Sequence, residues 1–300
     1  MQKAKKQKDM EVLDMAEYNL KNMRKEFKEK GIFYTPEELA LYLKSLFPNP
    51  QAIKEIYDPT CGSGNLLRVF DDDVAKYGQD INAEQLEEAK QRLKNFYGEA
   101  GDTLQNPKFM GKKFDFIVAN YPFSVKWEPL TEDERFQAAP AIPTASKADY
   151  AFILHILHYL SEKGIAVTLN FPGILYRGNK EGMIRKWIIE NNWIEKIIHI
   201  EGNTFVDTKI ATCVIIFNKA KENQEILFVD GEKQKSIRLK EIAENNYNLS
   251  VSTYIEKEDT REKIDIVKLN AEIEENVARQ NVLRTEIDKI IAEIEGSNCF

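Results

Sequence analysis

Short apolar runs alternate with longer amphipathic stretches over most of the chain. From residue 53 onward the apolar runs predict strands, and the stretches between them carry apolar residues at helical spacing. This alternation is typical of an α/β fold with a doubly wound, mostly parallel sheet. Strands are predicted at residues 55–57, 76–80, 114–119, 164–171, 194–200 and 212–218, and helices at residues 64–72, 83–97, 149–160 and 182–191.

Two helices are predicted before the sheet. The first occupies residues 1–30, where a few apolar residues lie among many Lys and Glu. The second begins at Thr35, which can cap it, and Pro36 suits its first turn. The two glutamates that follow face the positive end of the helix dipole. We expect these helices to form a short N-terminal segment, residues 1–50.

The last part of the chain has a different pattern. Residues 262–295 contain no Gly or Pro, and isoleucine and leucine recur at alternating three- and four-residue steps. Asn276 and Gln280 occupy the remaining seam positions, where polar residues can fix the register or partner of a coiled coil. We expect a coiled-coil-like helix for subunit association within residues 256–300. Packing of this helix onto the preceding domain, residues 51–255, is the alternative.

Composition and charge narrow the protein class. The chain has 300 residues, 43% of them hydrophobic, which is enough for a buried core. It has no apolar run long enough for a membrane span and no secretory signal. Three scattered cysteines argue against disulfides and favour a reducing, cytoplasmic location, and no cluster with metal-ligand spacing exists. The formal net charge of −7, taken alone, points away from a chain that grips nucleic acid by itself.

A glycine-rich string follows the first predicted strand. Asp58 ends that strand, and Thr60, Gly62 and Gly64 belong to the string D-P-T-C-G-S-G that leads into a helix. In an open α/β sheet, ligands bind where a strand ends and its helix begins. Glycines there let the backbone approach a ligand, although loops use glycine for many reasons. The string lacks the Lys and Ser/Thr of a P-loop, which disfavours ATP.

Two further acids follow predicted strand ends. Asp80, next to Ile81, can accept hydrogen bonds from both ribose hydroxyls of a nucleoside cofactor, or it can cap the next helix. Asp102, next to Thr103, lies beside the same crevice if a third strand ends at Gly101. It could then accept from an adenine amino group, and the alternative is an ordinary turn residue.

A buried strand ends at Asn120, followed by Tyr121, Pro122 and Phe123. The Asn120 amide oxygen and the carbonyl of Tyr121 could accept both hydrogens of an exocyclic amine and aim its lone pair at an electrophile. Phe123 could stack on a planar base. The alternative is a strand followed by a type I turn.

Together these motifs resemble the S-adenosylmethionine-dependent amino-methyltransferases. More narrowly, the chain resembles the modification (M) subunit of type I restriction–modification systems, which methylates adenine N6 in DNA. Matching strings at residues 33–36, 147–151 and 171–178 support the narrower resemblance, which covers roughly residues 30 to 255.

The resemblance implies a role for each matching residue. It implies an α/β fold of the S-adenosylmethionine-dependent methyltransferase type, with that molecule as cofactor and no metal. Flipping of the target base is expected, because a duplex hides the reacting nitrogen. The implied catalytic residues are Asn120, Tyr121, Pro122 and Phe123, and the implied cofactor-binding residues are Tyr34, Thr35, Pro36, Asp58, Thr60, Gly62, Gly64, Asn65, Leu66, Asp80, Ile81, Asp102, Thr103 and Asn120.

One departure concerns the catalytic string, in which Tyr121 stands where the family usually has proline. The acceptor there is a backbone carbonyl and Pro122 restricts Tyr121 to extended conformations, so we still expect activity.

The resemblance also implies partners. These are DNA, a specificity subunit docked on the C-terminal helix and a restriction subunit, in a hetero-oligomer with two copies of this chain. Transfer to protein glutamine or RNA is one alternative, and a cofactor-binding scaffold that has lost catalysis is another.

Overall fold

The computed structural model describes residues 35–202, 204, 211–256 and 266–297 of the chain. Contacts between Cα atoms divide the chain into two units, residues 1–256 and residues 257–300. The helix expected at residues 1–30 and the candidate cofactor residue Tyr34 lie outside the described residues.

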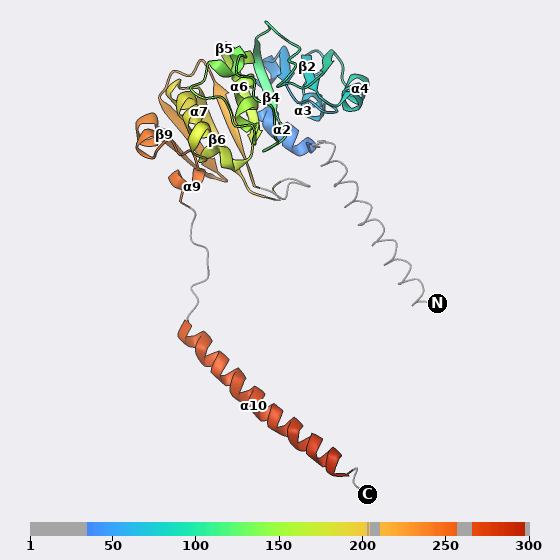
Figure 1. The fold of residues 1–300 in the computed structure, drawn as a ribbon, viewed down its shortest axis with the longest axis vertical. Coiled ribbons are helices and arrows are strands. Elements are labelled where there is room, and N and C mark those ends of the chain that lie inside the picture. Colours follow the sequence, from blue (N-terminus) through green and yellow to red (C-terminus); the bar gives the residue numbers. More distant parts are fainter. Residues whose placement is uncertain (1–34, 203, 205–210, 257–265, 298–300) are drawn as a thin grey trace, which may run out of the picture. The chain divides into compact units, whose positions relative to one another are not determined.

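The first unit is built on a nine-stranded sheet with the order β3-β2-β1-β4-β5-β7-β6-β8-β9 (Figure 1). The pairs β1–β2, β2–β3, β1–β4, β4–β5 and β6–β8 are parallel, whereas β7 runs antiparallel to β5 and β6, and β9 runs antiparallel to β8. The prediction of a mostly parallel α/β sheet is confirmed. The strands are β1 (Glu55–Asp58), β2 (Ala75–Asp80), β3 (Phe96–Ala100), β4 (Phe114–Ala119), β5 (Leu160–Asn170), β6 (Ile194–Ile200), β7 (Thr212–Asn218), β8 (Glu225–Asp230) and β9 (Lys233–Arg238).

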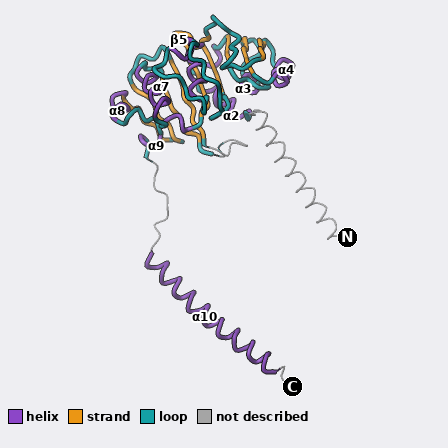
Figure 2. The backbone as a smooth tube through the Cα atoms, in the orientation of Figure 1, coloured by secondary structure: helices purple, strands orange, loops and turns teal. Residues whose placement is uncertain are grey.

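Each face of the sheet carries its own hydrophobic core. Successive strand residues alternate between the two cores, as Ile56 and Tyr57 do in β1 and Ile117 and Val118 do in β4. This alternation of two buried faces is what a doubly wound sheet requires. Helices supply the other side of each core, with α5, α6, η2, α7, α8 and α9 in one and α2, α3 and α4 in the other. Figure 2 colours the helices purple and the strands orange. They are α2 (Glu37–Ser45), α3 (Asn65–Arg68), α4 (Ala83–Arg92), α5 (Glu134–Gln137), α6 (Asp149–Tyr159), α7 (Asn179–Glu190), α8 (Leu239–Glu244), α9 (Val251–Tyr254), and the 3-10 helices η1 (Pro50–Ala52) and η2 (Pro172–Leu175).

Several sequence predictions about single elements are wrong. The helix predicted at residues 83–97 ends at Arg92, and its last residues belong to β3, where Tyr97 pairs with Tyr77 and stacks on it at 4.9 Å. The helix predicted at residues 64–72 is shorter, and the hairpin of β8 and β9 was not predicted. Thr35 does not cap α2, because Pro36 is the N-cap residue and makes no side-chain cap.

The second unit contains one long helix, α10 (Ile266–Ser297). Within the described residues of this unit its apolar stripe is uncovered, and each stripe residue is between 46% and 69% exposed. No helix in the described parts of the chain combines the length and apolar character that a membrane span needs. The stripe residues are Ile266, Leu269, Ile273, Leu283, Ile287, Ile290 and Ile294.

Candidate active site

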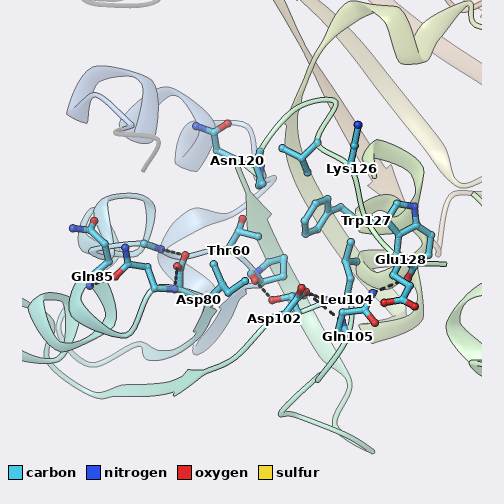
Figure 3. A pocket seen from close by; sticks show the side chains of 18 residues that line it. Thr60, Asp80, Gln85, Asp102, Leu104, Gln105, Asn120, Lys126, Trp127 and Glu128 are labelled. Atoms are coloured by element: carbon cyan, nitrogen blue, oxygen red, sulfur yellow. Dashed lines mark hydrogen bonds between the residues drawn. The ribbon is translucent and has the colours of Figure 1, made fainter. Parts of the chain in front are cut away.

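A cavity of about 420 Å³ lies at the carboxyl ends of the parallel strands β1 to β4. Figure 3 shows Thr60, Asp80, Asp102 and Asn120 around it, each from the loop or strand end of a different strand. The topology brings these side chains together, because the carboxyl ends of parallel neighbours share one edge of the sheet. The predicted site residues that line the cavity are Thr60, Gly62, Asp80, Ile81, Asp102, Thr103, Asn120 and Pro122.

The loop after β1 is held in its turn by backbone hydrogen bonds. Asp58 Oδ1 accepts from the Thr60 N–H at 3.0 Å, and the Gly64 N–H donates to the Cys61 carbonyl at 2.8 Å. Gly62 has φ +50°, and a Cβ there would meet only Gln85 Oε1, at 3.9 Å, across the cavity. Gly62 therefore leaves the backbone open to a ligand, as its position in the string indicates.

Gly64 packs tightly against the segment that follows β2. It has φ +81°, and a Cβ there would lie 2.5 Å from Leu93 Cδ1. Gly64 does not line the cavity. Its lack of a side chain allows the loop to pack on α4 and the residue after it, so it supports the site indirectly.

Asp80 connects the first two motifs. Its Oδ2 accepts from the Gly62 N–H at 2.7 Å, and its Oδ1 accepts from the Asn82 N–H at 2.8 Å. Burial raises the pKa of Asp80, while these two backbone donors act in the opposite direction. Burial also raises the pKa of Asp58, to about 8, against the lowering effect of the Thr60 N–H. Of these two carboxyl groups, only that of Asp80 lines the cavity.

Asp102 lies on the loop that follows β3. Its Oδ1 accepts from the N–H groups of Leu104 at 2.8 Å and Gln105 at 3.2 Å. The Thr103 hydroxyl donates to the Pro59 carbonyl at 2.5 Å and so joins this loop to the first motif. The third strand on which the prediction for Asp102 depended is present as β3.

Two buried side chains that sequence reasoning missed hold this loop in place. Arg135 donates to the carbonyls of Thr103 at 2.8 Å and Leu104 at 2.6 Å, and its side chain is 3% exposed. Gln79, fully buried, donates to the carbonyls of Gly101 and Asn106. No local pattern marks this role for either residue, because the carbonyls that they bind are more than twenty residues away.

Asn120 follows β4 and faces the cavity. Its Nδ2 donates to Thr35 Oγ1 at 3.1 Å. This hydrogen bond uses one of the two amide N–H donors and leaves the amide oxygen as an acceptor for a ligand. Thr35 is buried just before α2, so the upstream motif acts on the site by orienting Asn120.

Tyr121 is part of the core, with 1% of its surface exposed. Its ring stacks on Phe152 with centroids 5.0 Å apart, and its hydroxyl donates to Asn170 Oδ1 at 2.5 Å. Burial raises the pKa of this hydroxyl well above its ordinary value. Phe123 is half-buried and meets the Tyr121 ring edge-on at 6.0 Å. A tyrosine in this place therefore packs as a core residue, and the chain beyond it continues to Pro122 at the cavity wall.

Three other predicted cofactor residues are not among the lining residues. Asn65 and Leu66 begin α3 and are buried, and Pro36 is the N-cap residue of α2. Thr60 Oγ1 and Asn65 Oδ1 are buried with no hydrogen-bond partner among the described residues. Such atoms are rare in folded proteins and indicate a missing polar partner. Sequence reasoning also missed part of the lining, namely Gln85, Gln105, Val125, Lys126, Trp127, Glu128 and Phe152.

One group of potential metal ligands exists among the described residues, outside the cavity. His199, Glu201 and Asp230 have ligand atoms within 4.8 Å of one another near the ends of β6 and β8, and His199 Nδ1 lies 3.0 Å from Asp230 Oδ1. None of the three lines the cavity.

Comparisons with known proteins agree on one family. A profile described as N-6 DNA Methylase matches residues 7–237. The type I restriction enzyme MpnII methylase subunit of Mycoplasma pneumoniae is 30% identical over 89% of this chain and 61% of its own length. The MjaVII methylase subunit of Methanocaldococcus jannaschii is 27% identical over 89% of this chain and 56% of its own length.

Solved structures give the same result for the fold. The methyltransferase subunit of a type I restriction-modification system from Streptococcus thermophilus superimposes with a TM-score of 0.69 at 28% identity, covering 75% of this chain and 59% of that chain. The chain thus spans about six-tenths or less of these relatives. The expected methyltransferase type of fold is confirmed.

Proposed function

Because the chain belongs to the N-6 DNA methylase family, we propose that it transfers a methyl group from S-adenosylmethionine to the N6 amine of adenine in DNA. The observation that carries this proposal is the position of Asn120. Its amide oxygen is free to accept at the wall of a cavity whose other side holds Asp80 and Asp102. A nucleoside cofactor and an amine substrate would therefore meet at one place.

The cavity wall fits the parts of S-adenosylmethionine. Asp80 would accept from the ribose hydroxyls through the acceptor positions that Gly62 and Asn82 leave open. Asp102 would accept from the adenine amino group. The unpaired hydroxyl of Thr60, a lining residue, would offer a hydrogen bond to the amino-acid end, and Gly62 would give it room.

The chemistry on the substrate side needs two acceptors. Asn120 Oδ1 and the carbonyl of Tyr121 would accept the two hydrogens of the adenine amine and turn its lone pair toward the cofactor. When bound, S-adenosylmethionine would supply an electrophilic methyl group. The methylated nitrogen would then lose one proton to solvent water. Positioning of the two reactants and exclusion of water would accelerate the transfer. Phe123 would stack on the flipped base.

We further propose the partners that this chain would need. The predicted domains are an N-terminal segment (residues 1–50), a catalytic domain (residues 51–255) and a helix for subunit association (residues 256–300). The exposed stripe of α10 offers a coiled-coil seam to a separate specificity subunit that reads the DNA sequence. Two copies of this chain, and a restriction subunit in addition, would complete a cytoplasmic complex.

A methylation assay tests the catalytic proposal. The chain is mixed with the specificity subunit encoded beside its gene, DNA containing the target, and cofactor with a labelled methyl group. We expect label in N6-methyladenine. Asn120→Ala should abolish transfer while the Kd for cofactor stays within a few-fold, and the exposed Asn191→Ala serves as the matched control. Label in RNA or in protein glutamine, with none in DNA, would refute the assigned substrate.

A truncation tests the proposed docking helix. A chain ending at residue 256 should bind S-adenosylmethionine like the full chain but should not co-elute with the specificity subunit in size-exclusion chromatography. Replacing Leu283 and Ile287 of the full chain with glutamate should have the same effect, because both face outward. An intact complex with either variant would contradict this role.

A further inference from the structure

The residue after the catalytic string has an unusual backbone. Ser124 follows Phe123 and has φ +53°, in the left-handed region that residues other than glycine seldom adopt. This conformation turns the chain from Pro122 and Phe123 toward Val125 at the cavity wall. It costs free energy, so surrounding contacts must hold it.

A buried carboxylate supplies the first of these contacts. Asp149, the first residue of α6, is completely buried, and both of its oxygens accept from the Ser124 N–H at 3.2 Å. The positive end of the α6 dipole also favours a negative charge there.

An arginine from the loop after η2 supplies the second contact. Arg177 Nη2 donates to the Ser124 hydroxyl at 3.2 Å, and its Nη1 lies 3.7 Å from Asp149 Oδ2 and 3.5 Å from Glu181 Oε2. Its side chain is 16% exposed. The guanidinium thus bridges the serine and the carboxylate that hold the same turn, as a planar fork of donors allows.

The arginine is itself fixed in place. A Cβ on Gly173 would lie 2.7 Å from Arg177 Nε, so only glycine lets the guanidinium lie over η2. Buried Arg185 donates to the Arg177 carbonyl at 2.6 Å and to the Ile174 carbonyl at 3.2 Å. Two strings that matched the family in sequence, residues 147–151 and 171–178, therefore meet at Ser124.

None of Ser124, Asp149 and Arg177 lines the cavity. Val125, the next wall residue, is held separately, because its carbonyl accepts from the Ala148 N–H at 2.8 Å. The Asp149 and Arg177 side chains can thus act on the catalytic string without forming part of the cofactor wall.

From this geometry we propose that Asp149 and Arg177 are positioning residues for methyl transfer. By clamping Ser124 they fix the Tyr121 carbonyl and the Phe123 ring relative to Asn120, and so set the rate of the chemical step. The predicted effect of the clamp on the rate rests on the proposed function. Its predicted effect on the backbone does not, and can be measured on the chain alone.

The test compares Asp149→Asn and Arg177→Lys with wild type in the complete complex with specificity subunit and DNA. A displacement of about 1 Å in an active site can cost about 10²-fold in rate. We expect the single-turnover rate of transfer to fall by about that factor, while the Kd for S-adenosylmethionine stays within threefold. The double variant should lose little more than either single variant, because both residues act on one turn. Exposed Asp72→Asn and Arg92→Lys are the matched controls, and their rates should equal that of wild type.

A rescue separates positioning from general support of the fold. Glycine adopts positive φ without strain, so Ser124→Gly added to Asp149→Asn should recover part of the lost rate, about tenfold. Loss of cofactor binding together with a lower thermal midpoint in Asp149→Asn, with no rescue, would overturn the proposal in favour of a purely structural role.

Hydrogen exchange of the chain alone makes the test independent of catalysis. In Asp149→Asn, peptides covering residues 120–125 should exchange roughly tenfold faster or more, and those covering residues 60–66 should not change. Unchanged exchange at residues 120–125 would overturn the clamp. A wild-type complex that transfers no methyl group would instead refute the proposed function, and with it the effect on rate.

Discussion

Replacing Asp80 with asparagine tests the cofactor half of the site on this chain without any partner. Backbone donors fix both Asp80 oxygens, the Gly62 N–H at 2.7 Å and the Asn82 N–H at 2.8 Å. Each oxygen keeps a second acceptor position for a ribose hydroxyl. In Asp80→Asn the amide nitrogen must face the N–H of either Gly62 or Asn82. That N–H group loses its acceptor, and the two donors push the loop that carries it away from residue 80.

The expected loss follows from the kind of bond removed. A hydrogen bond to a charged acceptor contributes roughly 1.5 to 3 kcal/mol. One ribose hydroxyl loses its partner and the second keeps a neutral acceptor, so we expect a loss of about 2 to 3 kcal/mol in binding free energy. The Kd for S-adenosylmethionine should then rise by about 30- to 150-fold.

Isothermal titration calorimetry of the full chain measures this change. Asp72→Asn is the matched control, because Asp72 is an exposed acid paired with Lys94 at 2.6 Å and its loss changes the net charge equally. An analogue of the demethylated cofactor that lacks the ribose hydroxyls should bind wild type weakly. Its Kd should rise little further in Asp80→Asn. A Kd for Asp80→Asn within threefold of wild type, with an unchanged thermal midpoint, would refute the assignment of the ribose to this acid.

Three further predictions concern stability, each measured by urea unfolding. The first concerns Asp58, whose pKa is raised by burial to about 8. Between about pH 4 and pH 8, the folded chain therefore keeps a proton on Asp58 that the unfolded chain releases. Because of this difference, the contribution of Asp58 to stability is lost as the pH rises through that range. Asp58→Asn should flatten that fall, and an unchanged pH slope would contradict the buried, protonated state. Gly64→Ala should lower the free energy of unfolding by about 2 kcal/mol or more, because φ is +81° and the new methyl meets Leu93, and a neutral effect would mean that the loop moves freely. Tyr121→Phe should cost about 1 to 3 kcal/mol, because Asn170 Oδ1 loses its donor while buried, and no loss would show that water replaces the hydroxyl.

The strands that carry the site could be predicted because each is a short segment with a polar residue at or directly after its end. Asp58, Asp80 and Asn120 mark the carboxyl ends of β1, β2 and β4 directly in the sequence. Because neighbouring parallel strands end at one edge of the sheet, these three residues were enough to predict where the cavity lies. The prediction needed topology and no side-chain detail.

Elements decided by distant contacts could not be predicted in the same way. The segment before β3 has helical spacing, but pairing with β2 and the stacking of Tyr97 on Tyr77 outweigh that local preference. β9 is an edge strand with one buried residue, Ile237, and two lysines, so it lacks an apolar pattern. Thr35 has the residue type of a cap, yet its hydroxyl accepts from Asn120 instead. The packing that assigns these roles appears only after the chain has folded.

The apolar stripe of α10 has a consequence for how the protein must be produced. A 32-residue helix extends about 48 Å, and its isoleucines and leucines are about half exposed along that length. An uncovered seam of this kind is either an interaction site or an aggregation liability. Under the proposed assembly, chains without a partner would associate with one another or be degraded, so the amount of this chain that persists in the cell would follow the supply of its partner.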